Sequence, residues 1–121
     1  MKLKIVLLLA VVSIATIGLM PTKNVHAQDA GRKIEITAHR FAFSPAEITI
    51  KKGEPVVLVL KSTDVSHGLR FRELNAETKI PAGGTVELPL QAGEPGDFVG
   101  HCAVFCGAGH GEMTLTVHVV E

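Results

Sequence analysis

The sequence predicts an all-β protein, folded as an antiparallel Greek-key β-sandwich. Three observations support this fold class. After Gly31, apolar and polar residues alternate with a period of two over short segments. Glycine, proline, asparagine and serine separate these segments at short intervals. No segment in this region shows the 3.6-residue period of an amphipathic helix. The 121 residues have room for one domain.

The first strand is predicted at 33–37, where Ile34 and Ile36 face one side and charged or polar residues face the other. Phe41 and Phe43 continue the alternation until a Ser-Pro pair breaks it.

A short strand at 47–51 ends in a glycine- and proline-containing turn at 52–55. The next segment, 56–60, is apolar at every position. Five residues are too few for a helix, so we expect either a strand that is covered on both faces or a central strand of a sandwich.

Residues 66–71 are expected to form a strand, followed by a charged, irregular stretch through Lys79 and a turn at 81–84. Segment 85–90 alternates again. Its inward-facing residues are predicted to be Val86, Leu88 and Leu90.

A loop at 91–97 leads to a strand at 98–101, and a glycine-rich loop then runs from 102 to 112. The last strand is predicted at 113–119. Its inward-facing residues are Met113, Leu115, Val117 and Val119.

The charge of the chain argues against a nucleic-acid-binding protein. Lys and Arg together number 12, as do Asp and Glu, so the formal net charge is zero. There is no basic run and no alternation of basic and aromatic residues of the kind that binds nucleic acid. The distribution of charge is instead that of a mildly acidic domain that follows a basic N-terminus.

The N-terminus has the organisation of an export signal. Two lysines precede an apolar run from Ile5 to Met20, and Val25-His26-Ala27 fits the small-residue rule for cleavage after Ala27. We therefore predict a signal peptide at 1–27 and one domain at 28–121. Retention of the segment as a membrane anchor is the alternative, and membrane association is expected only in that case. Both place the domain in the periplasm or another extracytoplasmic space.

Four potential metal ligands lie within twelve residues of the glycine-rich loop: Cys102, Cys106, His110 and Met113. Thiolate and thioether sulfurs are soft donors that suit copper(I), and imidazole binds both copper oxidation states. Methionine is a poor ligand for zinc or magnesium, so the set favours copper. The glycines allow a short loop to bring these side chains to one point.

Other readings of the two cysteines fit less of the sequence. Structural zinc needs a second ligand pair that the chain lacks, and a thioredoxin-type motif needs C-x2-C before a helix. A nucleophilic cysteine would leave Met113 without a role. A Cys102–Cys106 disulfide without a metal is permitted in an exported protein. No catalytic site is predicted in this chain alone.

An upstream histidine, His67, is the candidate ligand from a different strand. With Cys106, His110 and Met113 it would make a mononuclear blue copper site. The additional cysteine, Cys102, changes this interpretation. Two thiolates three residues apart can each bridge two ions, so the loop has the donors for a pair of coppers. His39, His101 and His118 are expected on polar strand faces, and His101 remains an alternative extra donor.

From residue 34 to residue 119 the chain resembles the copper-binding domain of cytochrome c oxidase subunit II, a cupredoxin with the dinuclear copper A (CuA) centre. The likeness rests on Asp64-Val65-Ser66-His67-Gly68 and on the pattern C-x3-C-x3-H-x2-M at 102–113. The resemblance implies that Cys102 and Cys106 bridge both coppers. His67 and Met113 would complete one copper, and His110 and the backbone carbonyl of Val104 would complete the other.

The resemblance implies an electron carrier whose partners are a c-type cytochrome and a heme-copper oxidase. An exported copper chaperone remains an alternative, since it would use the same donors. The chain departs from the family in three respects. Val104 replaces a glutamate or glutamine, Trp and Tyr are absent, and no membrane hairpin is expected from this sequence.

Overall fold

The structure is a computed structural model that describes residues 31–121. This part of the chain forms nine strands and one short 3-10 turn. The elements are β1 (Arg32–His39), β2 (Ala42–Ser44), β3 (Glu47–Lys51), β4 (Val56–Ser62), β5 (His67–Phe71), β6 (Ala76–Ile80), β7 (Thr85–Leu90), β8 (Gly96–His101), η1 (His110–Glu112) and β9 (Thr114–Val120).

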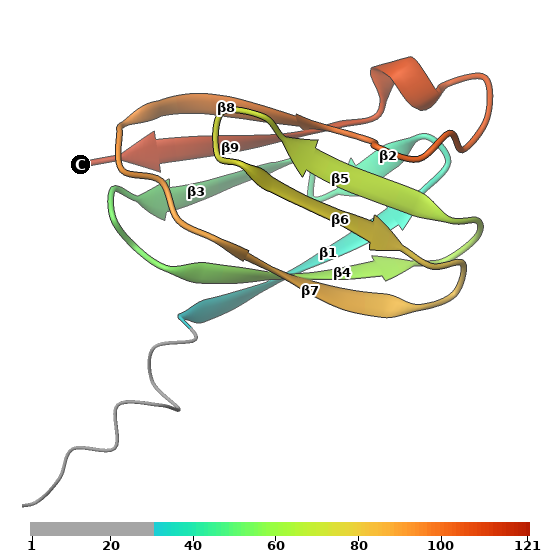
Figure 1. Ribbon diagram of the computed structural model, residues 1–121, viewed down its shortest axis with the longest axis horizontal. Coiled ribbons are helices and arrows are strands. Elements are labelled where there is room, and N and C mark those ends of the chain that lie inside the picture. The colour runs from blue at the N-terminus through green and yellow to red at the C-terminus, as the bar shows by residue number, and fades with distance from the viewer. Residues whose placement is uncertain (1–30) are drawn as a thin grey trace, which may run out of the picture.

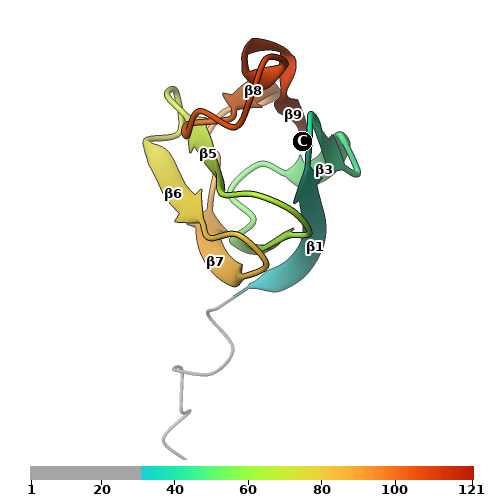
Figure 2. The same cartoon turned by 90° about the vertical axis from the view of Figure 1, so that its right-hand side faces the viewer.

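The strands form two sheets that pack face to face, as Figures 1 and 2 show. One sheet has the order β2-β1-β4-β7, and the other has the order β3-β9-β8-β5-β6. The predicted all-β sandwich is confirmed. Two pairs, β1 with β4 and β3 with β9, run parallel rather than antiparallel. The chain crosses between the sheets before and after β3, and a period-two pattern carries no information on strand direction.

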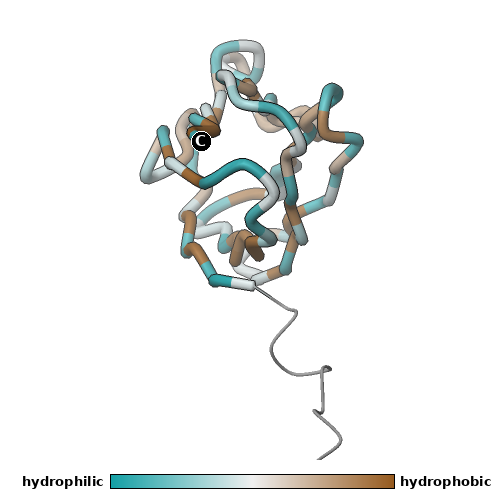
Figure 3. The backbone as a smooth tube through the Cα atoms, turned by 90° about the vertical axis from the view of Figure 1, so that its left-hand side faces the viewer, coloured by the Kyte–Doolittle hydropathy of each residue, from teal (hydrophilic) through white to brown (hydrophobic). Residues whose placement is uncertain are grey.

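The core lies between the sheets and is made by the inward-facing half of each alternating segment. Along the tube in Figure 3, hydrophobic and hydrophilic residues alternate accordingly. The largest fully buried apolar side chains are Phe43, Phe71, Ile36, Ile50, Leu58, Leu60, Leu69, Ile80, Met113 and Leu115. The packing is close. A Cβ at Gly100 would come within 2.6 Å of the Phe71 ring, so this position has room only for glycine.

Of the two alternatives, the structure shows a central sandwich strand: β4 lies between β1 and β7 in its sheet, and on its outward-facing side Val59 is half-buried and Lys61 is exposed. The outward-facing Val57 is buried all the same. Lys33 on β1 and Glu87 on β7 form a 3.0 Å ion pair across this strand. β7 lies at the edge of its sheet. Pro89 is tolerated there because an edge strand can direct the position that lacks a backbone N–H toward solvent.

Two local predictions are wrong. The stretch expected to be irregular through Lys79 contains β6, whose Ile80 is buried opposite His67. The charged residues of β6 point to solvent. Its inner face is only partly apolar, so the sequence does not show the clear alternation that predicts a strand. Phe41 does not extend the first strand. It belongs to the turn between β1 and β2 and is 38% exposed.

The signal-peptide and anchor predictions fall on residues 1–27, which lie outside the described part of the chain. Within residues 31–121 no helix has the length and apolar character needed to cross a membrane.

Candidate metal centre

The predicted ligands meet at one end of the sandwich, opposite the C-terminus (Figure 1). β8 ends at His101 and β9 begins at Thr114, so the ligand loop, residues 102–113, connects two neighbouring strands. β5 starts at the same end with His67. Gly68 permits the close approach, because a Cβ there would lie 3.0 Å from Ala103.

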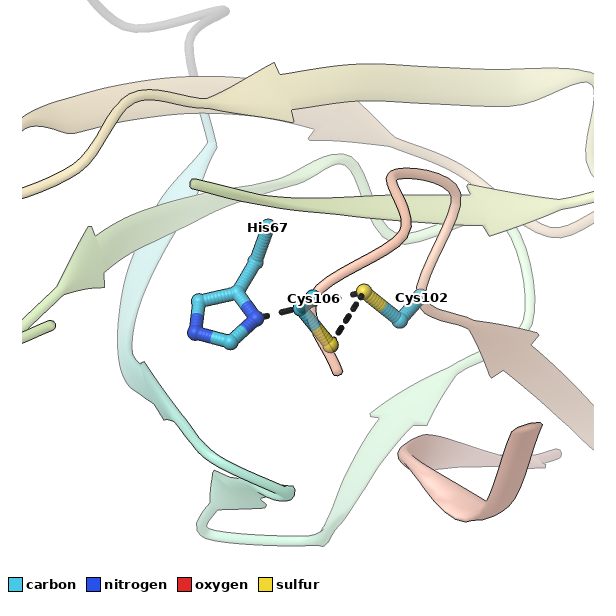
Figure 4. A group of neighbouring side chains, drawn as sticks. All are labelled: His67, Cys102 and Cys106. Carbon is cyan, nitrogen blue, oxygen red and sulfur yellow. Dashed lines mark hydrogen bonds between the residues drawn. The ribbon is translucent and has the colours of Figure 1, made fainter. Parts of the chain in front are cut away.

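The two cysteines and the upstream histidine form a compact buried group (Figure 4). The Sγ atoms of Cys102 and Cys106 are 3.7 Å apart, and both thiols are free. The Nδ1 atom of His67 lies 4.0 Å from the sulfur of Cys102. A disulfide would need a sulfur–sulfur distance of about 2.05 Å, so these sulfurs are neighbours without a bond.

The other three predicted ligands surround this group from further sides. The Sγ of Cys106 lies 3.8 Å from Nδ1 of His110 and 3.9 Å from Sδ of Met113. The carbonyl oxygen of Val104 lies 3.1 Å from the Sγ of Cys102. All six residues named from the sequence therefore lie in one cluster. His67 and Val104 contact Cys102, whereas His110 and Met113 contact Cys106.

The spacing of the donors fits metal binding. In tetrahedral zinc sites, nitrogen and sulfur ligands bind the ion at about 2.0–2.3 Å. Two ligands of one such ion are therefore roughly 3.3–3.8 Å apart. The sulfur–sulfur and sulfur–nitrogen separations of 3.7–4.0 Å are close to this range. The donors can therefore bind ions with small movements. Two thiols, two imidazoles and a thioether form a soft set that suits copper.

Burial controls the protonation of the Cys106 thiol. Cys102 and Cys106 are each only 5% exposed. Burial, with a hydrogen bond to Cys102, raises the pKa of the Cys106 thiol to about 11. Cys106 is therefore a neutral thiol at pH 7 in the metal-free protein. Metal binding has to displace its proton, so affinity rises with pH.

A carboxylate fixes the orientation of His67. The Nε2 atom of His67 lies 2.7 Å from Oδ1 of Asp64, and His67 itself is fully buried. With the proton on Nε2, the ring donates to Asp64 and its Nδ1 lone pair faces the sulfurs. Histidine ligands of metals are commonly oriented in this way. Asp64 is part of the sequence motif at 64–68, but the motif alone does not predict this role.

Asp64 remains ionised over the whole physiological range. Burial raises the pKa of its carboxyl group, but hydrogen bonds from the Arg40 backbone N–H, from His67 and from the Val65 N–H outweigh this effect. The resulting pKa is about 2, below the usual 3.8. His67 therefore has a permanent acceptor on the side away from the sulfurs.

Two aromatic side chains lie at the ligand loop, Phe41 packed on it and Phe105 within it, and the sequence does not predict either position. The ring of Phe41 packs on the loop so closely that a Cβ at Gly109 would come within 2.4 Å of it. Gly107 contacts the same ring with φ of +138°, a conformation that favours glycine. Phe105 packs against His110 with the rings tilted by 48° and their centroids 5.6 Å apart, and it is 79% exposed.

The remaining histidines of residues 31–121 make no hydrogen bond to the donor atoms. His101 is exposed, and His39 lies with Nδ1 3.3 Å from the Arg40 carbonyl. His118 lies on a polar strand face, as expected, and is also paired with acidic side chains. Its Nδ1 lies 2.6 Å from Asp97, which with Glu47 raises the pKa of the ring.

Residues 6–115 match the family described as cupredoxin-like domain. The chain belongs to the cupredoxin-like family. This cupredoxin is 36% identical over 89 residues to a nitrous-oxide reductase of Cupriavidus necator, an alignment that covers 69% of this chain and 14% of the reductase. It is 27% identical over 88 residues to a cytochrome c oxidase subunit 2 of Thermus thermophilus, covering 73% of this chain and 65% of that subunit.

Among solved structures, the periplasmic domain of subunit II of the Bradyrhizobium japonicum cytochrome oxidase superposes with a TM-score of 0.69 at 18% identity. The superposition covers 76% of this chain and 86% of that domain. The resemblance to oxidase subunit II, predicted from the two motifs, is confirmed. The cupredoxin fold, the relatives and the donor set together support copper binding.

Proposed function

We propose that this cupredoxin is an extracytoplasmic electron carrier that binds two copper ions in a CuA centre. One observation carries the proposal: two buried, unbonded cysteine sulfurs lie 3.7 Å apart, each with further donors of its own beside it. A mononuclear blue site would need only one of these thiols. Two sulfurs placed side by side are suited to bridge a pair of ions.

In this centre, Cys102 and Cys106 would hold both ions. His67 and Met113 would be the further ligands of one ion, and His110 and the Val104 carbonyl oxygen those of the other. Only the backbone of Val104 takes part, so an apolar side chain at this position is compatible with the role. When bound, the coppers supply a one-electron couple whose charge is shared over two bridged ions.

The residues of the chain suit electron transfer better than substrate chemistry. Four donors for each ion leave no open coordination position, whereas metal catalysis requires one. His67 lies on β5, and the other donors lie on the loop between β8 and β9, from which Cys102, Cys106 and Met113 pack into the close-packed core. A rigid donor set changes little between the oxidised and the reduced state.

The redox partner is expected to dock at the ligand-loop end. Phe105 is exposed there and packs against His110, so a partner that contacts the Phe105 ring comes within a few ångströms of a proposed copper ligand. A shallow hollow of about 340 Å³ adjoins it, lined by Arg40, Val65, Ser66, Phe105, Cys106 and Gly107. A c-type cytochrome as donor and a heme-copper oxidase as acceptor are the partners that we propose.

The test is to load the purified protein with copper after reduction of its thiols and to measure copper per chain together with the EPR spectrum. Two coppers per chain, with one unpaired electron coupled equally to both nuclei, support the proposal. A single copper with a blue mononuclear spectrum would contradict it. Rapid transfer of the copper to an apo-oxidase, without electron exchange with a cytochrome, would instead identify a chaperone.

A further inference from the structure

Arg40 contacts two separate segments that carry copper ligands. It lies in the turn between β1 and β2. Its backbone N–H donates to Oδ2 of Asp64 over 2.8 Å. Its side-chain Nε donates to the carbonyl oxygen of Cys106 over 3.1 Å, in a partly buried contact. One residue thus connects segments that lie 24 and 66 positions away in the sequence.

Each of these contacts is one step from a donor atom. The other carboxylate oxygen of Asp64 binds Nε2 of His67 over 2.7 Å. The carbonyl that accepts from Arg40 belongs to Cys106, whose Sγ lies at the centre of the donor cluster. The chain from His67 through Asp64 and Arg40 to Cys106 therefore fixes the two ligand-bearing segments relative to each other without any metal.

The guanidinium also brings a permanent positive charge to this end of the molecule, because arginine stays protonated at every relevant pH. Its Nε lies 3.1 Å from the carbonyl oxygen of Cys106, so this charge lies close to the donor cluster. By electrostatic attraction it favours whichever redox state of the centre carries one more electron. Asp64 is the carboxylate in this chain of contacts, and its oxygens bond to the backbone N–H of Arg40 and to His67 rather than to the guanidinium.

We infer that Arg40 is a positioning residue of the copper centre, which holds the ligand loop against the His67 segment and favours the reduced state of the bound metal. The inference rests on the proposed CuA function. It assigns to a turn residue two separable effects: the hydrogen bond to the Cys106 carbonyl sets geometry, and the charge sets the reduction potential.

Three variants separate these effects, since all of them keep the backbone N–H that binds Asp64. Arg40→Lys keeps the charge and loses the fixed Nε donor. Arg40→Gln keeps a hydrogen-bond donor and loses the charge, and Arg40→Met loses both. The matched control is Arg32→Met, which removes an exposed arginine at the other end of β1, eight residues or roughly 26 Å away.

The geometric effect is measured in the reduced, copper-free protein by amide hydrogen exchange of His110 and Glu112, whose N–H groups bond within the ligand loop. We expect at least tenfold faster exchange in Arg40→Met and Arg40→Lys, and none of this acceleration in Arg32→Met. Equal exchange rates in Arg40→Met and the wild type would overturn the positioning role.

The charge effect is measured in the copper-loaded protein by redox titration and EPR. Arg40→Gln and Arg40→Met are expected to lower the midpoint potential, so that the equilibrium between the two redox states shifts about tenfold toward the oxidised state. Arg40→Lys is expected to shift it less. An unchanged potential in Arg40→Met would overturn this part. If the wild type fails to bind two coppers, the CuA proposal falls, and the exchange experiment still decides the positioning role on its own.

Discussion

Two regions of this cupredoxin contain a histidine paired with an aspartate at nearly the same distance, and they differ in almost everything else. At the ligand-loop end, His67 bonds to Asp64 over 2.7 Å and is fully buried. On the outer face of β8 and β9, His118 bonds to Asp97 over 2.6 Å with 34% of its side chain exposed. The buried pair has its second ring nitrogen directed at a sulfur, whereas the exposed pair has its second nitrogen near Glu47.

The difference shows that a histidine–carboxylate pair acquires its role from what surrounds it. Burial makes the first pair a rigid support, in which the carboxylate determines which nitrogen is free to bind metal. Exposure leaves the second pair as a bridge between neighbouring strands, where water and salt weaken the attraction. The following predictions test this contrast, beginning with the largest effect.

Replacing the two histidines should separate the regions most clearly. His67→Ala is expected to abolish the dinuclear spectrum and to weaken copper binding by more than a hundredfold, because one ion loses a ligand. His118→Ala should bind copper as the wild type does. Copper titrations followed by absorption and EPR measure both, and equal losses in the two variants would contradict the assignment of His67.

Replacing the two carboxylates should give a smaller effect of the same kind. Asp64→Ala is expected to weaken copper binding by about 10–100-fold, the usual cost of losing the partner that orients a histidine ligand. Asp97→Ala is the matched control and should leave the affinity unchanged. Comparable affinities in Asp64→Ala and the wild type would show that His67 holds its orientation without the carboxylate.

The enclosure of the buried region can be tested at the glycines under Phe41. Gly109→Ala places a Cβ within 2.4 Å of that ring, so the aromatic cover has to shift. We expect a loss of about 1–3 kcal/mol in the free energy of unfolding, as for other overpacked sites. Gly111→Ala is the control, since its Cβ would meet nothing within 4 Å. Chemical denaturation of the two variants gives the comparison.

The smallest effect is expected at the exposed pair and depends on pH. The hydrogen bond to Asp97, and then Glu47, raises the pKa of His118 above its usual 6.5. The stabilisation is therefore fully present below about pH 6.5 and disappears as the pH rises through the raised pKa.

The measurement for this pair is the difference in unfolding free energy between the wild type and His118→Gln, followed from pH 5 to pH 9. That difference should shrink on going to alkaline pH. Asp64 behaves oppositely, because its lowered pKa of about 2 keeps its contribution above pH 4 and removes it only in strong acid. A difference that grows with pH would rule out the protonated bridge at His118.

The contrast between the regions also explains what could be predicted from the sequence. Most strands were predicted because their inner faces are apolar at every second residue, as in Thr114–Val120. The cluster of ligands was predicted because four donors lie on one short loop, which must fold back on itself. Strand β6 was missed because Glu77 and Lys79 dominate its composition although both point to solvent.

The residues that support the site could not be found in the same way. Arg40, Asp64 and Cys106 are far apart in the sequence and meet only after the two sheets have packed. Phe41 was expected to follow the alternation of its neighbours, and nothing local indicates that the chain turns there and sets the ring on Gly109. Long-range packing, which periodicity does not encode, decides these contacts.

The position of the ligand loop opposite the C-terminus has a practical consequence for wiring the protein to an electrode. β9 spans seven residues, so an attachment at Glu121 would hold the sulfurs about 20 Å or more from the conducting surface, with the ligand loop on the side of the solution. Such a film would exchange current slowly with the electrode and rapidly with soluble carriers. Attachment through a thiol-free aromatic monolayer that adsorbs Phe105 would reverse that preference.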